Sequence, residues 1–261
     1  MNSLKLADYP AAYKLYCSTF EFFPLIGSVL QNQQDGAVYT NNSEAPTQFY
    51  IEHQFGFAQL FGKSDRQFEA ALEQRLLHQK NFAPTKVRLY TPMFPDFLKS
   101  KQGDQIRSER QRFALPSNWI TKRHTLQIDA SDINLTAVDE ANIKVIETQF
   151  GVVSRFWRNG DAFISQSGAV IAWSDNEPVA ICYASALASE CAEIDVLTLP
   201  EYRHKNLGKK VAVQFCINCI EKGIKPVWDC FTNNIGSMSL CRSIGFVPSY
   251  APYPFFTFNR T

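Results

Sequence analysis

The feature that most constrains this chain is a strand-like segment that runs into a basic loop and then into a helix, between Ala192 and Gly223. The first amide groups of a helix have no acceptor inside the helix, and the helix dipole adds partial positive charge there. A diphosphate satisfies both needs, so the loop from Tyr202 to Gly208 predicts an anion site. The alternative is a solvated helix start with its lysines on the outer face.

The loop sequence YRHKNLG supports the anion site in three ways. Gly208 lets the backbone come close to an oxygen, and Asn206 tolerates a left-handed conformation where glycine is more usual. Long basic side chains that can attract and contact a polyanion surround these two residues: Arg203, Lys205, Lys209 and Lys210.

Composition limits the remaining choices. The chain has 261 residues, of which 45% are hydrophobic and 20% charged, as expected for one large or two smaller globular domains. The formal net charge of +1 gives no global field for nucleic acid, so an anion site must be local. No run approaches about 18 apolar residues, so we expect no membrane span. The N-terminal stretch MNSLKLADYPAAYKLYC does not resemble a secretory signal.

The cysteines and histidines predict neither disulfides nor a metal site. There are seven cysteines, an odd number, and most lie in apolar runs, unlike a secreted disulfide framework. Cys216 and Cys219 form a C-x-x-C pair, but their helical spacing predicts core packing rather than redox or zinc chemistry. His53, His78 and His124 lack metal-like spacing. We therefore expect a reduced, cytoplasmic protein without a metal.

Residues 1–110 are expected to form an N-terminal α+β domain. Two aromatic strand-like runs, with Gly56 as a bulge, precede a helix whose Ser64 and Gln67 have capping-box spacing, and a short strand follows. This order echoes the strand, loop, helix and strand around Tyr202. The domain is therefore either a degenerate copy of the same half-fold or an unrelated α+β domain.

Residues 111–261 are expected to form a second, more regular domain. The polar run at 99–112 predicts a surface connection between the two. A strand at 123–129 and a hairpin turning at Asp175 and Asn176 follow, and the aromatic tail YPFFTF is expected to complete the sheet of this domain.

A second motif begins at Asn234, after the strand PVWDC. Its spacing places Ser237 at +3, Leu240 at +6, Cys241 at +7 and Gly245 at +11, followed by a phenylalanine. The segment predicts a short helix capped by the asparagine.

Both motifs resemble those of GNAT acetyltransferases. RHKNLG resembles the family's (R/Q)-x-x-G-x-(G/A) pyrophosphate loop, with Asn206 replacing the first glycine, and the second motif resembles N-x-x-(A/S)-x-x-L-Y-x-x-x-G-F, with Cys241 replacing tyrosine. Residues 110 to 250 look most like the branch that contains the zwittermicin-A resistance acetyltransferase. The resemblance implies an α+β class with a C-terminal GNAT fold, in which helices flank a central mixed, mostly antiparallel twisted sheet.

The resemblance also implies acetyl-CoA as the cosubstrate. Backbone groups of a splayed strand and the loop would bind it, although Asn234 as a pure N-cap and Ser237 as a small packing residue are adequate alternatives. The cofactor-binding residues so implied are Val196, Leu197, Thr198, Leu199, Arg203, His204, Lys205, Asn206, Leu207, Gly208, Lys209, Lys210, Asn234 and Ser237.

For catalysis, the resemblance favours Glu193 as the base that takes the amine proton. Asp195 lies two residues further on, so the two carboxylates share one face of the strand. Asp195 is the second catalytic candidate, and the alternative for both carboxylates is a solvated or salt-bridged edge of the sheet. Many GNAT enzymes place a general-acid tyrosine at the position of Cys241, so the acid here is either water or a group elsewhere.

The implied function is an acetyl-CoA-dependent N-acetyltransferase in which the amine of a small molecule attacks the thioester directly. The alternative is a non-catalytic acetyl-CoA or CoA sensor of the same fold, which the missing tyrosine favours and Glu193 disfavours. The N-terminal domain would form a wall of the substrate cleft or a dimer contact. We expect no nucleic-acid or membrane partner, and a homodimer is one expected assembly.

Overall fold

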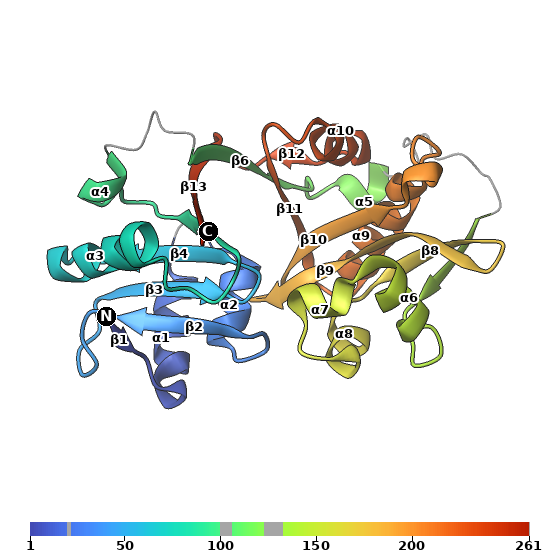
Figure 1. Ribbon diagram of the computed structural model, residues 1–261. Coiled ribbons are helices and arrows are strands. Elements are labelled where there is room, and N and C mark those ends of the chain that lie inside the picture. Colours follow the sequence, from blue (N-terminus) through green and yellow to red (C-terminus); the bar gives the residue numbers. More distant parts are fainter. Residues whose placement is uncertain (20–21, 100–105, 123–132, 261) are drawn as a thin grey trace. The chain divides into compact units, whose positions relative to one another are not determined.

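The computed structural model describes residues 1–19, 22–99, 106–122 and 133–260 (Figure 1). The chain folds into two compact units. The first comprises Met1–Arg110 together with Tyr253–Thr261, and the second comprises Gln111–Pro252. The strand expected at 123–129 lies outside the described residues.

The first unit contains a sheet that is antiparallel except for its β4/β5 pair, which is parallel and connected through α3. Its strands lie in the order β1 (Asn2–Ser3), β2 (Gly36–Thr40), β3 (Gln48–His53), β4 (Phe57–Gly62), β5 (Lys86–Tyr90) and β13 (Tyr253–Asn259). The described helices are α1 (Tyr9–Cys17), α2 (Pro24–Leu30), α3 (Arg66–Glu73) and α4 (Asp96–Lys99), with a 3-10 helix at Leu6–Asp8 and a π-helix at Gln74–Gln79.

The second unit repeats this arrangement, with a parallel β10/β11 pair connected through α9. Its strands lie in the order β7 (Asn134–Ala137), β8 (Val170–Ser174), β9 (Glu177–Ala188), β10 (Cys191–Thr198), β11 (Lys225–Phe231) and β6 (Arg107–Ala114), and β12 (Val247–Pro248) also pairs with β6. The described helices are α5 (Trp119–Lys122), α6 (Ile143–Phe150), α7 (Val152–Phe156), α8 (Gly160–Gln166), α9 (Leu207–Glu221) and α10 (Ile235–Ile244), with a 3-10 helix at Pro200–Tyr202.

The two units therefore share one strand order. In each, the first four strands pair antiparallel, the fourth and fifth pair parallel around a helix, and a sixth strand lies beyond the fifth. This agreement favours the degenerate copy over an unrelated first domain. In Figure 1, α7 and α8 lie on one face of the second sheet and α9 on the other.

Two local expectations in the first unit are corrected. The N-cap of α3 is Asp65 rather than Ser64, because the Asp65 carboxylate accepts a hydrogen bond from the amide of Phe68 at 3.0 Å. Gly56 is not in a bulge. Its amide donates to the carbonyl of His53 at 2.7 Å, so it lies in the turn that joins β3 and β4 as a hairpin.

Two expectations about the chain's course also change. The polar run at 99–112 is not wholly a surface connection, since its last residues belong to β6 and bury Arg110, Gln111 and Arg112. The aromatic tail forms β13, which pairs with β5 and with residues 107–110 of β6 in the first unit. It does not complete the sheet of the second unit. The turn at Asp175 and Asn176 is as predicted, and both residues have positive φ.

Each unit has its own hydrophobic core. In the first, Phe68 and Leu72 of α3 pack with strand residues that include Phe256 of β13. In the second, α9 packs against the sheet, and Cys216 and Cys219 lie in that core, as predicted. Burial raises the pKa of Cys219 to about 12, so its thiol stays protonated at neutral pH. The pair therefore packs as small apolar residues do.

One buried histidine of the first unit is held in a neutral state. His53 is fully buried, and its Nδ1 accepts a hydrogen bond from the amide of Phe55 at 3.0 Å. The proton is therefore on Nε2, which donates to Oε1 of Gln34 at 3.0 Å. The same oxygen accepts from Ser28 at 2.7 Å. Burial lowers the pKa of His53 to about 4, against a smaller opposing effect of Asp35.

This histidine predicts acid destabilisation. Because the folded-state pKa is depressed, the unfolded chain binds a proton below pH ~6.5 that the folded chain does not, and stability falls as the pH decreases toward 4. Between pH 7 and 4.5 the contribution amounts to roughly 2–3 kcal/mol. Urea unfolding should show a pH dependence smaller by that amount in His53→Gln. Identical pH dependence in both proteins would contradict the assignment.

Candidate active site

The site begins where β10 parts from β11. β10 pairs with β9 along its whole length, from Cys191 to Thr198. Its parallel pairing with β11 covers only the residues up to Glu193, opposite Lys225 to Val227. Both strands are described throughout. Beyond Glu193, the side of β10 that faced β11 therefore presents backbone groups without a strand partner, and such groups require other hydrogen bonds.

A β-bulge lies at the same point. The register between β9 and β10 shifts between Glu193 and Ile194, so that Ser185 of β9 is the extra residue. The Ser185 hydroxyl donates to the carbonyl of Glu193 at 3.0 Å. Bulges increase local twist and redirect a strand. This one coincides with the divergence of β10 from β11.

The loop after β10 has the backbone geometry expected from its sequence. After the 3-10 helix, His204 and Asn206 both adopt positive φ, and Asn206 lies at φ 60° and ψ 10°. The Asn206 side chain does not cap α9, and the first helical hydrogen bond runs from the amide of Lys210 to the carbonyl of Asn206 at 3.0 Å. The preceding amides therefore point out of the helix end.

The basic residues of this loop differ in exposure. Arg203, His204 and Lys205 are exposed, Lys209 is half-buried, and Lys210 is only 5% exposed. The Lys205 ammonium lies 4.7 Å from the centre of the Tyr202 ring. The exposed cations are thus the ones placed to meet an anion arriving from solvent.

Gly208 brings three elements together. A Cβ at this position would lie 3.1 Å from Oγ1 of Thr198, 3.7 Å from Val196 and 3.6 Å from Leu240 of α10. The missing side chain therefore lets the first turn of α9 rest on the end of β10 and beside α10. The two sequence motifs meet at this glycine.

The asparagine motif has a clear local role. Asn234 caps α10, because its Oδ1 accepts from the amide of Ser237 at 3.1 Å. The Ser237 hydroxyl accepts from the indole nitrogen of Trp228 on β11 at 2.9 Å. Both residues thus fix α10 to the strand beside the opening.

Cys241 is turned away from solvent. It is fully buried, and its thiol donates to the carbonyl of Met238 at 3.3 Å. A hydrogen bond with Cys230, and then burial, raise the pKa of Cys241. A thiol in this setting is a core residue. It is therefore not placed to replace the proton-donating tyrosine that the family resembled by these motifs has at this position.

The two carboxylates of β10 share one face of the strand. Ala192, Ile194 and Val196 pack into the core with α9, so Glu193 and Asp195 lie on the opposite face, as their spacing predicts. Glu193 is 5% exposed. It is the last residue of β10 that pairs with β11, at the start of the opening.

Asp195 has two partners that sequence reasoning did not identify. The Tyr183 hydroxyl donates to its Oδ2 at 2.6 Å, and Nη1 of Arg155 on α7 lies 3.3 Å from the same oxygen. Burial, followed by the charge of Asp195, raises the pKa of Tyr183 well above its usual value, so the phenol remains a donor. The only signal in the sequence was that an acid within an apolar run needs a partner.

A third carboxylate lies on this face of the sheet. Trp228 and Cys230 pack into the core, so Asp229 of β11 projects to the other side. Its Oδ2 lies 2.9 Å from Nε of Arg112 on β6, and its side chain is fully buried. On this face, Asp195 and Asp229 are therefore each paired with an arginine.

Among the described residues, no group of three or more His, Cys, Asp or Glu side chains is placed to hold a metal ion. Within the same part of the chain, no helix combines the length and apolar character needed to cross a membrane.

Comparison with known proteins agrees with this geometry. The chain belongs to the GNAT acetyltransferase family, whose model matches residues 19–256. It is similar to the uncharacterized N-acetyltransferase YdfB of Bacillus subtilis (strain 168), with 29% identity over 254 residues that cover 91% of this chain and 90% of that protein. Enzymes of the family use acetyl-CoA as the acetyl donor.

Solved structures show the same fold over almost the whole chain. A GCN5-related N-acetyltransferase-like protein from Streptococcus suis 89/1591 has a TM-score of 0.70 at 15% identity, covering 98% of this chain and 100% of that one. A GNAT-family acetyltransferase from Colwellia psychrerythraea has a TM-score of 0.60 at 12% identity, covering 99% of each. The predicted α+β class and GNAT fold are confirmed.

The two ion pairs on the carboxylate face should differ in their effect on stability. Asp229→Asn removes the carboxylate charge that lies 2.9 Å from the buried Arg112 guanidinium, and we expect a loss of about 3–5 kcal/mol in the free energy of unfolding. Arg155→Gln breaks a partly exposed pair and should cost about 1 kcal/mol or less. Denaturant unfolding of both variants tests this, and equal losses would contradict it.

Proposed function

We propose that the protein is an acetyl-CoA-dependent N-acetyltransferase that acts on the amine of a small molecule. The observation that carries the proposal is the parting of β10 from β11 after Glu193, followed along the chain by an uncapped helix N-terminus at Leu207. The first supplies backbone groups for a peptide-like pantetheine arm, and the second supplies amides and a dipole for a diphosphate. On the residues quoted from its sequence, we also place the C-terminal half in the branch of the zwittermicin-A resistance acetyltransferase.

In this proposal the cofactor follows the elements in order. The diphosphate lies at the start of α9, with Gly208 allowing close approach and the exposed Arg203 and Lys205 facing it. The pantetheine arm runs along the open side of β10, and α10 lies beside it. The binding residues proposed are Val196, Leu197, Thr198, Leu199, Arg203, His204, Lys205, Asn206, Leu207, Gly208, Lys209, Lys210, Asn234 and Ser237.

The left-handed backbone of Asn206 gives a direct test of the phosphate loop. Asn206→Gly should keep acetyl-CoA affinity within about threefold, since glycine takes this conformation freely. Asn206→Val should lower the affinity about tenfold, because a left-handed conformation costs an L-residue about 1–2 kcal/mol. Calorimetric titration of folded protein with acetyl-CoA measures both. Equal affinities for the two variants would refute a role for this geometry.

For the chemistry, we propose that the acceptor amine attacks the acetyl carbonyl carbon of the thioester. A backbone amide of β10 beyond the bulge stabilises the oxygen that becomes negative. Glu193 takes the proton that the nitrogen loses, the C–S bond breaks, and the thiolate of CoA leaves with a proton from water. Asp195 is proposed to support the site through Tyr183 and Arg155, which it holds.

Substitutions of the two carboxylates should separate these roles. Glu193→Gln should lower the rate about a hundredfold or more with unchanged acetyl-CoA affinity, since a general base contributes about 10²–10⁴. Asp195→Asn should change the rate by less than about tenfold. Thiol release with an amine found by an acceptor screen provides the rate. A Glu193→Gln enzyme with the wild-type rate and pH profile would remove Glu193 as the base.

The second candidate is a non-catalytic acetyl-CoA or CoA sensor, which the burial of Cys241 favours. Such a protein would bind acetyl-CoA but release no thiol with a broad panel of amines.

The proposed enzyme is cytoplasmic and binds neither nucleic acid nor membranes. The first unit is proposed to form a wall of the substrate cleft or a contact in a homodimer.

A further inference from the structure

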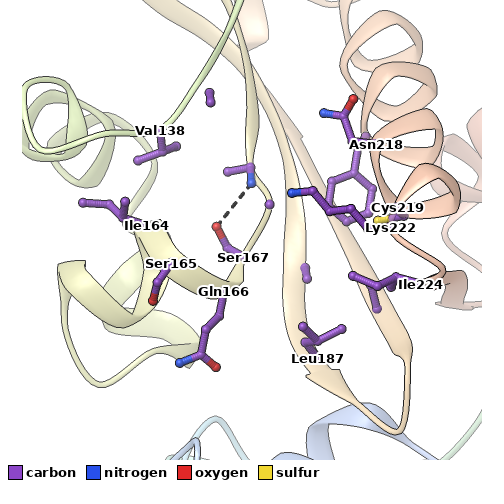
Figure 2. Close-up of a pocket in the computed structure, with 16 residues that line it drawn as sticks. Val138, Ile164, Ser165, Gln166, Ser167, Leu187, Asn218, Cys219, Lys222 and Ile224 are labelled. Carbon is purple, nitrogen blue, oxygen red and sulfur yellow. Dashed lines mark hydrogen bonds between the residues drawn. The ribbon is translucent and has the colours of Figure 1, made fainter.

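The second unit contains a cavity that the proposed reaction does not use. Its volume is about 330 Å³, and it lies between the end of α8, the start of β8, β9 and the C-terminal half of α9 (Figure 2). Small-molecule sites in proteins begin at about 300 Å³. The cavity therefore suits a small ligand and is too small for a CoA molecule.

The cavity is separate from the phosphate loop. Asn218 lines it and lies about 16 Å further along α9 than Leu207, at about 1.5 Å per helical residue. None of the residues proposed to bind the cofactor lines the cavity. A ligand here would be accommodated together with acetyl-CoA.

The charge of the cavity is positive. No aspartate or glutamate lines it, whereas Lys222 does. In Figure 2 the Lys222 side chain extends from α9 across the cavity toward the side occupied by Ser167. Lys222 takes part in no ion pair among the described residues. Lys222 is exposed, so its ammonium is available to pair with an anion that enters the cavity from solvent.

Two further side chains can donate to the same anion. Ser167 is 1% exposed, and its Oγ accepts from the amide of Ala169 at 3.3 Å, which leaves the hydroxyl proton to be donated. Oδ1 of Asn218 accepts from Gln214 at 2.8 Å, which leaves its amide hydrogens as donors. Both line the cavity, on opposite sides in Figure 2.

The rest of the lining is apolar. Val138, Ile164, Leu187, Phe215 and Ile224 contribute hydrocarbon from five different parts of the unit. Such walls favour a ligand with an apolar body, since burial of its carbon atoms contributes about 25 cal/mol per Å². A lining that combines these donors with hydrocarbon suits an amphipathic ligand.

We propose that this cavity binds a small carboxylate with an apolar chain or ring, at a site distinct from the acetyl-CoA site. The carboxylate lies among Lys222, Ser167 and Asn218, and its apolar part contacts Leu187 and Phe215. The inference does not depend on the proposed catalytic activity, because the two sites share no residue.

The test is a titration of the full chain with octanoate in the presence of saturating acetyl-CoA, in which ligand-observed NMR measures the binding. We expect saturable binding, and weaker binding of octanamide, which has the same shape without the charge. Lys222→Gln should weaken octanoate binding about threefold to fivefold, as expected for an exposed ammonium, and leave octanamide binding unchanged. Leu187→Trp should weaken both ligands at least tenfold by filling the cavity.

Lys225→Gln is the matched control, since it removes an exposed lysine from the same end of the unit without touching the lining. It should bind octanoate like the wild type. The proposal is overturned if octanoate does not saturate, if octanamide binds equally well, or if Lys222→Gln and Lys225→Gln behave alike. Loss of octanoate binding when acetyl-CoA is added would also overturn it, by showing that the two ligands compete.

Discussion

The rest of the site depends on one break in hydrogen bonding, the end of the β10/β11 ladder after Glu193. A parallel pair that continued would satisfy the backbone of β10 and leave nothing for a ligand. The bulge at Ser185 redirects β10 at that point, and Gly208 allows α9 to begin against its end. Backbone groups, helix dipole and loop cations are therefore gathered at one place by a few small residues.

The first unit shows how the same topology is closed to an anion. Its β4/β5 ladder also ends after three pairs, at Gln59, but Gln59 is fully buried and accepts a hydrogen bond from the Tyr16 hydroxyl of α1 at 2.5 Å. The start of α3 is occupied by the carboxylate of Asp65. An internal acid there takes the position that an external phosphate would need. The contrast with the uncapped Asn206 is one of side chains rather than fold.

The sequence predicted those features of the site that depend on residues close together in the chain. The left-handed Asn206, the capping Asn234, the core packing of Cys216 and Cys219 and the shared face of the two carboxylates all follow from neighbouring residues. The partners of Asp195 were not predictable, because its position opposite Tyr183 depends on the β9/β10 register, which a bulge shifts, and Arg155 reaches it from α7, an element distant in sequence. The pairing of β13 was missed for the same reason, since alternating aromatic residues fit any strand position with one covered face.

The pairing of β13 also determines the order in which the two units can complete their sheets during synthesis. Phe256 lies opposite Leu89 of β5 and belongs to the core of the first unit, although the whole second unit separates them along the chain. Chains emerge from the ribosome starting at the N-terminus, and domains generally fold as they emerge. The residues of the second unit are therefore synthesised before Tyr253–Asn259, and the first unit, whose other strands are synthesised earlier, gains its last strand only after them. The unit made first is the one finished last.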